Sequence, residues 1–276
     1  MSEVDVLIPT CDRGAALAVT LASLCAQTFA AFAVIVSDQS HAAGAERWGE
    51  VRAAIRVLES HGNPVRLVEH LPRRGIAEQR QFLLEQSAAP LVLCLDDDVI
   101  LEPWVLELLV QTLRSEGCGF VGSAAIGLSY LDDVRPHEQH VDPWQGPVEP
   151  EEVRPGTPAW ERFKLHNAAN LCHVQRRLGA TPDAPVRYKV AWCGACALYD
   201  AAKLRSVGGF SFWQDLPAEH CGEDVLAQLR VMRAYGGCGV MPSGVYHQEL
   251  PTTIPQRRVS AERALGWGTV RPPRGG

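Results

Sequence analysis

The sequence lacks any apolar run long enough to cross a lipid bilayer. A membrane-spanning helix needs about 20 mostly apolar residues, and polar side chains interrupt every hydrophobic stretch here before that length. An excess of basic residues is also missing, because 26 Lys and Arg stand against 32 Asp and Glu, for a net charge of −6. Nucleic-acid-binding proteins normally carry a basic face, so we expect no nucleic-acid partner.

Patterns typical of secretion are missing as well. The opening MSEVDVLIPT runs directly into a strand pattern, so we expect no signal peptide. The nine cysteines are scattered, and most lie in apolar runs, where a free thiol behaves as a small hydrophobe. These features favour a reducing cytoplasm.

The positive charge is concentrated near the C-terminus. Five arginines follow residue 256, against the single acid Glu262. We therefore treat residues 251–276 as a basic C-terminal tail, which either frays in solvent or touches an anionic surface. The second interpretation would place a cytoplasmic protein at the inner face of the membrane, as a peripheral contact.

The first half of the chain alternates short apolar runs with helical patterns. Strands are predicted at residues 4–9, 32–37, 65–69, 91–95 and around 120–121, with helices at 15–27, 45–60, 76–86 and 103–114. This alternation indicates an α/β fold of Rossmann type, with a mostly parallel central sheet flanked by helices.

The alternation ends at Gly127. Residues 127–158 are rich in proline, acids and histidine without a period, which predicts a long loop or lid. Further elements are predicted as helices at 159–178 and 223–235 and as strands at 188–192, 195–199, 239–241 and 245–247. Because no repeat or low-complexity linker divides the chain, we predict one domain over residues 1–276, with an elaborated second half.

Three adjacent carboxylates, Asp96, Asp97 and Asp98, follow the apolar strand pattern LVLCL. In an open parallel sheet, ligands gather at the carboxyl ends of the strands. The carboxylates repel one another, and Mn²⁺ or Mg²⁺ would neutralise them while also taking phosphate oxygens. The alternative is a solvated acidic turn before a helix.

Two further positions could carry chemistry. Glu223 and Asp224 open a predicted helix, either as ordinary first-turn acids or as carboxylates fixed on a rigid element, where one could act as a general base. His247 ends a predicted strand and could join carboxylates around Mn²⁺, although a lone histidine is more often packed or on the surface.

Two other motifs are interpreted as coincidental. The glycines of residues 117–122 match GxGxxG, but this segment follows a helix and enters a strand, the reverse of a dinucleotide site. Cys193 and Cys196 have CxxC spacing, but no second pair of ligands accompanies them, as zinc would require.

The order of the motifs resembles the family-two glycosyltransferases of the GT-A fold. VLIPTCDR is similar to that family's Ile-Pro-Thr-Tyr-Asn-Arg strand end, and VIVSDQS to its Val-Asp-Asp-Gly-Ser turn. The segment from RRGIAEQRQF to CLDDDV is similar to its Asn-x-Gly helix and Asp-x-Asp metal motif. AWCGACALYDAAKLRSVGGF and GEDVLAQL are similar to its acceptor-side segment and its Glu-Asp helix. The resemblance covers residues 3–126 and 188–247, with departures at Cys11, Ser37, Arg73 and Gln81.

The resemblance implies a metal-dependent transfer of a sugar from a nucleoside-diphosphate donor, with a UDP-sugar favoured, to an unknown hydroxyl acceptor. Residues 1–126 would bind the nucleotide sugar and residues 127–250 the acceptor. Asp224 would be the general base of an inverting reaction. The implied donor-binding residues are Pro9, Thr10, Arg13, Asp38, Arg80, Asp96 and Asp97, the metal ligands are Asp96, Asp98 and His247, and the acceptor-binding residues are Trp192, Trp213 and Glu223.

Alternatives remain for several of these assignments. Arg80 could instead form a surface salt bridge, and either tryptophan could be a buried core residue. A sugar-phosphate nucleotidyltransferase would share the architecture, but its first strand leads into a glycine-rich loop, whereas PTCDRGAAL holds one glycine. A non-catalytic, transferase-like scaffold would have no need of Asp98 or Asp224.

Overall fold

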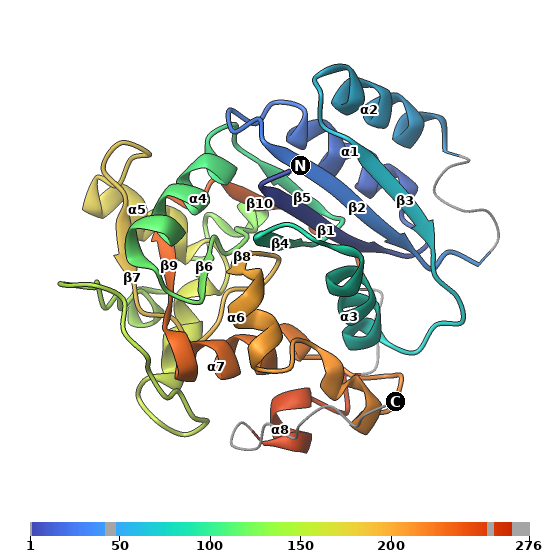
Figure 1. The fold of residues 1–276 in the computed structure, drawn as a ribbon. Coiled ribbons are helices and arrows are strands. Elements are labelled where there is room, and N and C mark those ends of the chain that lie inside the picture. Colours follow the sequence, from blue (N-terminus) through green and yellow to red (C-terminus); the bar gives the residue numbers. More distant parts are fainter. Residues whose placement is uncertain (1, 42–47, 253–256, 267–276) are drawn as a thin grey trace.

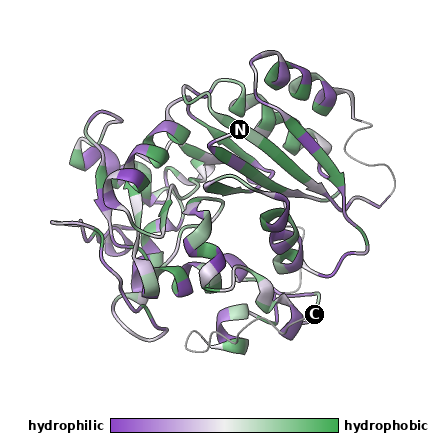
Figure 2. Cartoon of the chain, in the orientation of Figure 1, coloured by the Kyte–Doolittle hydropathy of each residue, from purple (hydrophilic) through white to green (hydrophobic). Residues whose placement is uncertain are grey.

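The computed structural model describes residues 2–41, 48–252 and 257–266, which form a central sheet with helices on both faces (Figure 1). The first half contains β1 (Val4–Thr10), α1 (Gly14–Leu24), β2 (Phe32–Asp38), α2 (Gly49–Ser60), β3 (Val65–Glu69), α3 (Ile76–Gln86), β4 (Leu91–Leu95), β5 (Val99–Leu101), α4 (Val105–Glu116) and β6 (Phe120–Gly122). Hydrophobic residues predominate in the strands of this half (Figure 2).

The second half mixes short helices with short strands. It contains 3₁₀ turns at Leu128–Tyr130, Pro136–Glu138, Trp160–His166 and Ser211–Asp215, then α5 (Asn170–Leu178), β7 (Val186–Tyr188), β8 (Cys196–Asp200), α6 (Ala201–Ser206), α7 (Glu223–Tyr235), β9 (Gly237–Met241), β10 (Val245–His247) and α8 (Ala261–Leu265). Among the described residues, no helix is long and apolar enough to cross a membrane.

Eight strands form the main sheet in the order β3-β2-β1-β4-β8-β6-β9-β7. The pairs β1–β2, β2–β3, β1–β4 and β6–β9 are parallel, whereas β8 runs antiparallel to β4 and β6, and β7 runs antiparallel to β9. The predicted α/β fold with a mostly parallel sheet is confirmed, and each of the antiparallel pairs just named includes β7 or β8 from the second half. A separate ribbon joins β5 to β10.

Each face of the sheet has its own hydrophobic core. Strand side chains alternate between opposite faces, so in β1 Val6 and Ile8 pack with α1, α2 and α4, while Leu7 points to the core of α3 and α7. Because both faces are covered, all seven residues of β1 are buried. The strand therefore ends at a rigid edge, and the polar residues that follow it are held in place.

The helix predicted over 159–178 is wrong at its centre. A 3₁₀ helix ends at His166, Asn167 is extended, Ala168 adopts φ +49°, and α5 begins at Asn170. Asparagine side chains compete with helical hydrogen bonds. Here the Asn167 amide donates to Glu138 Oε2 (3.1 Å) and the Asn170 amide to the carbonyl of Lys164 (3.1 Å), and these bonds end one helix and begin the other.

One predicted strand is shifted along the sequence, and one observed strand was not predicted. The strand predicted at 188–192 is observed at Val186–Tyr188. There it pairs with β9, from Val186 opposite Met241 to Tyr188 opposite Gly239. The short strand β5, which follows the acidic cluster, had no clear pattern and was not predicted. It pairs with β10 and so brings His247 opposite Val99, one residue after Asp98.

Candidate active site

A cavity of about 810 Å³ opens beyond the carboxyl ends of β1 and β4. The first turns of α3 and α7 form further parts of its wall, since Ile76 and Glu223 line it. The predicted site residues that line it are Pro9, Thr10, Arg13, Arg80, Asp96, Asp97, Asp98, Trp192, Glu223, Asp224 and His247. The chain thus brings together side chains that are more than 200 residues apart in sequence.

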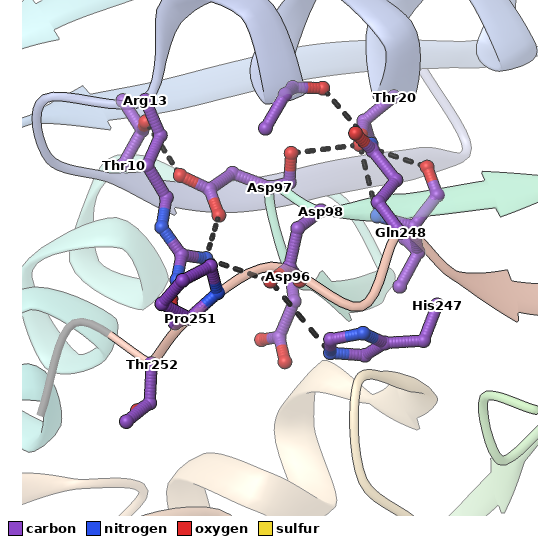
Figure 3. A network of polar contacts seen from close by, with 12 residues as sticks. Thr10, Arg13, Thr20, Asp96, Asp97, Asp98, His247, Gln248, Pro251 and Thr252 are labelled. Atoms are coloured by element: carbon purple, nitrogen blue, oxygen red, sulfur yellow. Dashed lines mark hydrogen bonds and ion pairs between the residues drawn. The ribbon is translucent and has the colours of Figure 1, made fainter. Parts of the chain in front are cut away.

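Arg13 neutralises part of the acidic cluster (Figure 3). Its Nη1 donates to Asp98 Oδ2 at 2.7 Å and lies 3.3 Å from Asp97 Oδ1. Asp97 is buried and also accepts a hydrogen bond from the Thr10 hydroxyl at 2.7 Å. Burial raises the pKa of Asp97 to about 6, although Thr10 and Arg13 act in the opposite direction.

Arg80 joins the acidic cluster to α7. It is buried, with Nη2 2.7 Å from Asp96 Oδ1 and Nε 2.9 Å from Glu223 Oε1. Burial alone would lower the pKa of Arg80, but the two carboxylates outweigh it and raise the pKa well above its usual value. The surface salt bridge considered for Arg80 is therefore wrong. Glu223 lines the cavity with one oxygen already paired.

Asp224 stands beside this bridge with a different electrostatic environment. Its Oδ1 accepts the backbone N–H of Val225 at 2.8 Å, within the first turn of α7. Burial, followed by the nearby charge of Glu223, raises the pKa of Asp224 to about 7, while Arg80 acts to lower it. A carboxylate with a pKa near the working pH is suited to general-base catalysis.

Two predicted site residues do not line the cavity. Asp38 is buried at the end of β2, where its Oδ1 accepts from the backbone N–H (2.9 Å) and hydroxyl (2.6 Å) of Ser40. Trp213 lies in a 3₁₀ turn against the core, with the Arg74 guanidinium 6.0 Å from the ring centroid. Their predicted contacts with donor and acceptor stay predictions.

Trp192 lines the cavity and is only half-buried. Its ring packs against Trp160 at 4.9 Å and stacks on Phe163 at 5.3 Å between centroids. One side of the indole is therefore held by protein. The arrangement matches neither a fully buried core tryptophan nor a freely mobile surface one.

The C-terminal segment contributes residues that were not predicted as site residues. The backbone N–H of Cys221 donates to the carbonyl of Val259 (3.0 Å), and the carbonyl of Cys221 accepts from the backbone N–H of Ala261 (2.8 Å). These two bonds attach the C-terminal segment to the turn before α7. Arg257, Ser260 and Glu262 thereby line the cavity. The part of the tail outside 251–252 and 257–266 is not described. In the sequence, Glu262 could have been singled out because it is the one acidic residue in a basic segment.

Another unpredicted lining residue is Gln39, which directly follows β2. It is buried, and its Nε2 has no hydrogen-bond partner among the described residues. In contrast, no described residue of the predicted lid, 127–158, lines the cavity. Val148 and Val153 from that segment are instead buried in the two cores.

Asp98 and His247 are the predicted metal ligands that approach each other, with 3.6 Å between Oδ2 and Nε2 (Figure 3). Asp96 is turned toward Arg80. In the part of the chain that is described, no three His, Cys, Asp or Glu side chains are arranged as a metal-binding group. A carboxylate and an imidazole nevertheless suit Mn²⁺ chemically, and the distance between them allows both to contact one ion.

Residues 5–177, more than half of the chain, match the model of Glycosyl transferase family 2. The chain belongs to this family. Family membership agrees with the predicted resemblance and gives no support to the nucleotidyltransferase alternative. No match was found among curated proteins.

Solved structures show the same GT-A fold as this family-2 chain. Residues 1–349 of TarS from S. aureus match with a TM-score of 0.54 and 15% identity, over 90% of this chain and 60% of those residues. The mannosyltransferase PcManGT from Pyrobaculum calidifontis, solved with GDP-Man and Mn²⁺, matches with a TM-score of 0.51 and 18% identity, over 86% of this chain and 56% of its own. The structure of TarS residues 1–349 with UDP-GlcNAc gives a TM-score of 0.53 at 14% identity, over 92% of this chain and 60% of those residues. This chain therefore spans less than two thirds of each.

The environment of the CxxC pair in this family-2 chain does not make its thiols reactive. Cys193 and Cys196 are free and buried. Burial raises the pKa of both thiols far above the usual value, and only the thiolate is a nucleophile or metal ligand. The two thiols therefore act as small core side chains.

Proposed function

We propose that the chain is a metal-dependent, inverting glycosyltransferase that moves a sugar from a nucleoside-diphosphate donor to an acceptor hydroxyl. The observation that carries the proposal is one cavity with an acidic cluster at one wall and Asp224 at another, joined through buried Arg80. Two relatives of the same fold were solved with UDP-GlcNAc and with GDP-Man and Mn²⁺. We favour a UDP-sugar for this chain.

The donor would lie along the carboxyl ends of β1 and β4. Pro9, Thr10 and Arg13 border this end of the cavity, beside Asp96 and Asp97. Asp96, Asp98 and His247 would hold Mn²⁺ or Mg²⁺, which supplies positive charge against the developing charge of the diphosphate leaving group. Arg13 and Arg80 keep the carboxylates in place through the ion pairs described above.

Asp224 takes the proton from the acceptor hydroxyl. The hydroxyl oxygen forms a bond to the anomeric carbon while the bond from that carbon to the diphosphate oxygen breaks. Attack opposite the leaving group inverts the configuration. Glu223, paired with Arg80, orients the first turn of α7 toward the cavity, and Trp192 offers a flat face to the acceptor sugar.

We expect binding of the donor diphosphate to require a divalent cation, because a carboxylate-lined wall repels a phosphate that has no counter-ion. Calorimetry with UDP and GDP, in Mn²⁺ and then in excess EDTA, measures this directly. Affinity should fall by at least about tenfold in EDTA, which corresponds to roughly 1.4 kcal/mol. Equal affinity in both conditions would mean that Arg13 and other basic side chains hold the diphosphate alone.

The raised pKa of Asp224 predicts the pH dependence of turnover. The base must be deprotonated, so kcat/KM should fall about tenfold per pH unit as pH drops below about 7. The raised pKa of Asp224 has the opposite effect on stability: turnover should increase with pH, whereas the free energy of unfolding should decrease. A folded-state pKa above the unfolded value of 3.8 means that the folded state binds the proton more tightly, so this group's contribution is lost as pH rises from about 4 to 7.

The control is Asp224→Asn, which cannot titrate. Its residual kcat/KM should lack the acidic limb, and its unfolding free energy should change less than that of the unmodified protein between pH 4 and 7. An unmodified protein whose kcat/KM stays flat down to pH 5 contradicts the assignment of the base.

A further inference from the structure

The wall of the cavity next to Asp224 is built by two segments far apart in sequence. The turn before α7 supplies Glu219 and the start of the helix supplies Glu223, while the C-terminal segment supplies Glu262. Two backbone hydrogen bonds at Cys221 and a parallel bridge between Cys221 and Ser260 hold the segments together. This carboxylate-rich surface, Glu219, Glu223, Asp224 and Glu262, is called the acceptor wall below.

Glu262 is the unusual member of the acceptor wall. Its side chain is 7% exposed, yet Oε2 has no hydrogen-bond partner among the described residues. The nearest described cation is the exposed Arg263, with Nε 3.8 Å from the other oxygen. A buried carboxylate oxygen without a partner is unfavourable. Because Glu262 borders the cavity, a bound molecule can supply the missing donor.

The position of the Glu262 carboxylate is held by the turn that opens α7. Gly222 has φ +75°, and a Cβ at that position would lie 2.5 Å from Glu262 Oε2. The positive φ favours glycine, and the missing side chain leaves room for the carboxylate beside the turn. Oε2 of Glu262 lies against Gly222, two positions before Asp224. A molecule that reaches the base therefore also meets Glu262.

Within the acceptor wall, Glu223 is the member whose carboxylate is paired with a buried cation. Arg13 is paired with Asp97 and Asp98, and Arg80 with Asp96 and Glu223. The Nη1 of Arg73 lies 3.1 Å from Nε2 of His41. Arg257 is an exposed residue at the rim. An anionic acceptor would meet like charges here, which disfavours binding.

Trp192 adds an apolar face to the same region. Asp224 Oδ2 lies 3.9 Å from the Cβ position of Gly194, two residues from Trp192, and both Trp192 and Asp224 line the cavity. A sugar ring has C–H faces that pack on an indole and hydroxyls that donate to carboxylates. The combination of a flat aromatic surface and unpaired carboxylate oxygen suits such a molecule.

We propose that Glu262 binds the acceptor, and that the acceptor is an uncharged, polyhydroxylated molecule such as a glycoside, not a phosphorylated one. Glu262 Oε2 accepts a hydrogen bond from a hydroxyl that neighbours the attacking hydroxyl, while Asp224 receives the proton of the latter. This inference rests on the proposed function, because it names the acceptor class of that same site.

The test compares neutral and phosphorylated acceptors that differ only in charge. p-Nitrophenyl glycosides of glucose, mannose, galactose and N-acetylglucosamine are offered beside their 6-phosphates, with UDP-GlcNAc or GDP-mannose as donor and Mn²⁺ present. Transfer is followed by mass spectrometry, and donor hydrolysis is followed in parallel. Glu262→Gln removes the charge at nearly constant size, and Glu59→Gln, an exposed change on α2, is the matched control.

We expect the unmodified protein to use neutral acceptors with a higher kcat/KM than their phosphates. Removing the Glu262 charge relieves its repulsion of the phosphate, so the ratio of the neutral to the phosphorylated kcat/KM should fall at least about tenfold in Glu262→Gln, with the ratio for Glu59→Gln unchanged. A purely structural effect would lower both values equally and leave the ratio constant, which contradicts the proposal. Preference for phosphorylated acceptors, or donor hydrolysis without transfer to any neutral acceptor, overturns it as well. If neither donor binds nor is hydrolysed, the proposed function itself fails.

Discussion

Replacing Asp98 by asparagine should lower turnover by several orders of magnitude while the protein remains folded. Asp98 Oδ2 is the point where Arg13 Nη1 (2.7 Å) and His247 Nε2 (3.6 Å) approach the acidic cluster. The amide keeps the size of the side chain but loses the negative charge that a divalent cation requires, and metal ligands contribute several kcal/mol to the stabilisation of a transition state.

The experiment measures kcat/KM and its Mn²⁺ dependence in Asp98→Asn. Asp183→Asn is the matched control, because Asp183 is exposed in a turn and does not line the cavity. Thermal unfolding verifies that both variants fold. Normal turnover with normal Mn²⁺ dependence in Asp98→Asn would remove Asp98 from the metal site.

Replacing Asp224 by asparagine should reduce turnover about 10²–10⁴-fold, the usual contribution of a general base. Nucleotide affinity should stay near that of the unmodified protein. The reason is position: Asp224 opens α7 on the acceptor wall, while the acidic cluster follows β4, and Arg80 lies between the two. Removing the base thus leaves the ion pairs of Arg13 and Arg80 intact.

Both quantities must come from the same variant, with calorimetry for UDP or GDP and initial rates for transfer. A collapse of nucleotide affinity in a folded protein would assign Asp224 to the donor or metal site. Unchanged turnover would place the base elsewhere, with Glu223 and Asp215 as the next candidates. Since Glu223 is already paired with Arg80, it would first have to leave that ion pair.

The central part of the site was predictable because regular structure determines where it lies. Buried parallel strands end at one edge, so residues after β1 and β4 had to lie close together, and Thr10 does contact Asp97. A helix that begins with Glu223 and Asp224 places carboxylates in its first turn. These inferences need only the period of the strands and the order of the motifs.

The remainder depends on contacts between distant segments, which local patterns do not encode. The pairing of β5 with β10 and the return of residues 257–262 to Cys221 have no signature in spacing. Asp38 was expected to contact a ligand, yet its Oδ1 accepts two hydrogen bonds from Ser40. Arg13 was expected at the donor site, but its ion pairs with two carboxylates became visible only in three dimensions.

The attachment of the C-terminal segment has a consequence for how such a protein can diversify. Residues 257–266 border the cavity, but Ala261 is their one buried contribution to the hydrophobic cores as described. The family match ends at residue 177, well before this segment. Under the proposed function, substitutions there would alter which acceptors are admitted while the sheet, both cores and the acidic cluster keep their sequence. Acceptor choice could then evolve in this segment independently of the chemistry at the acidic cluster.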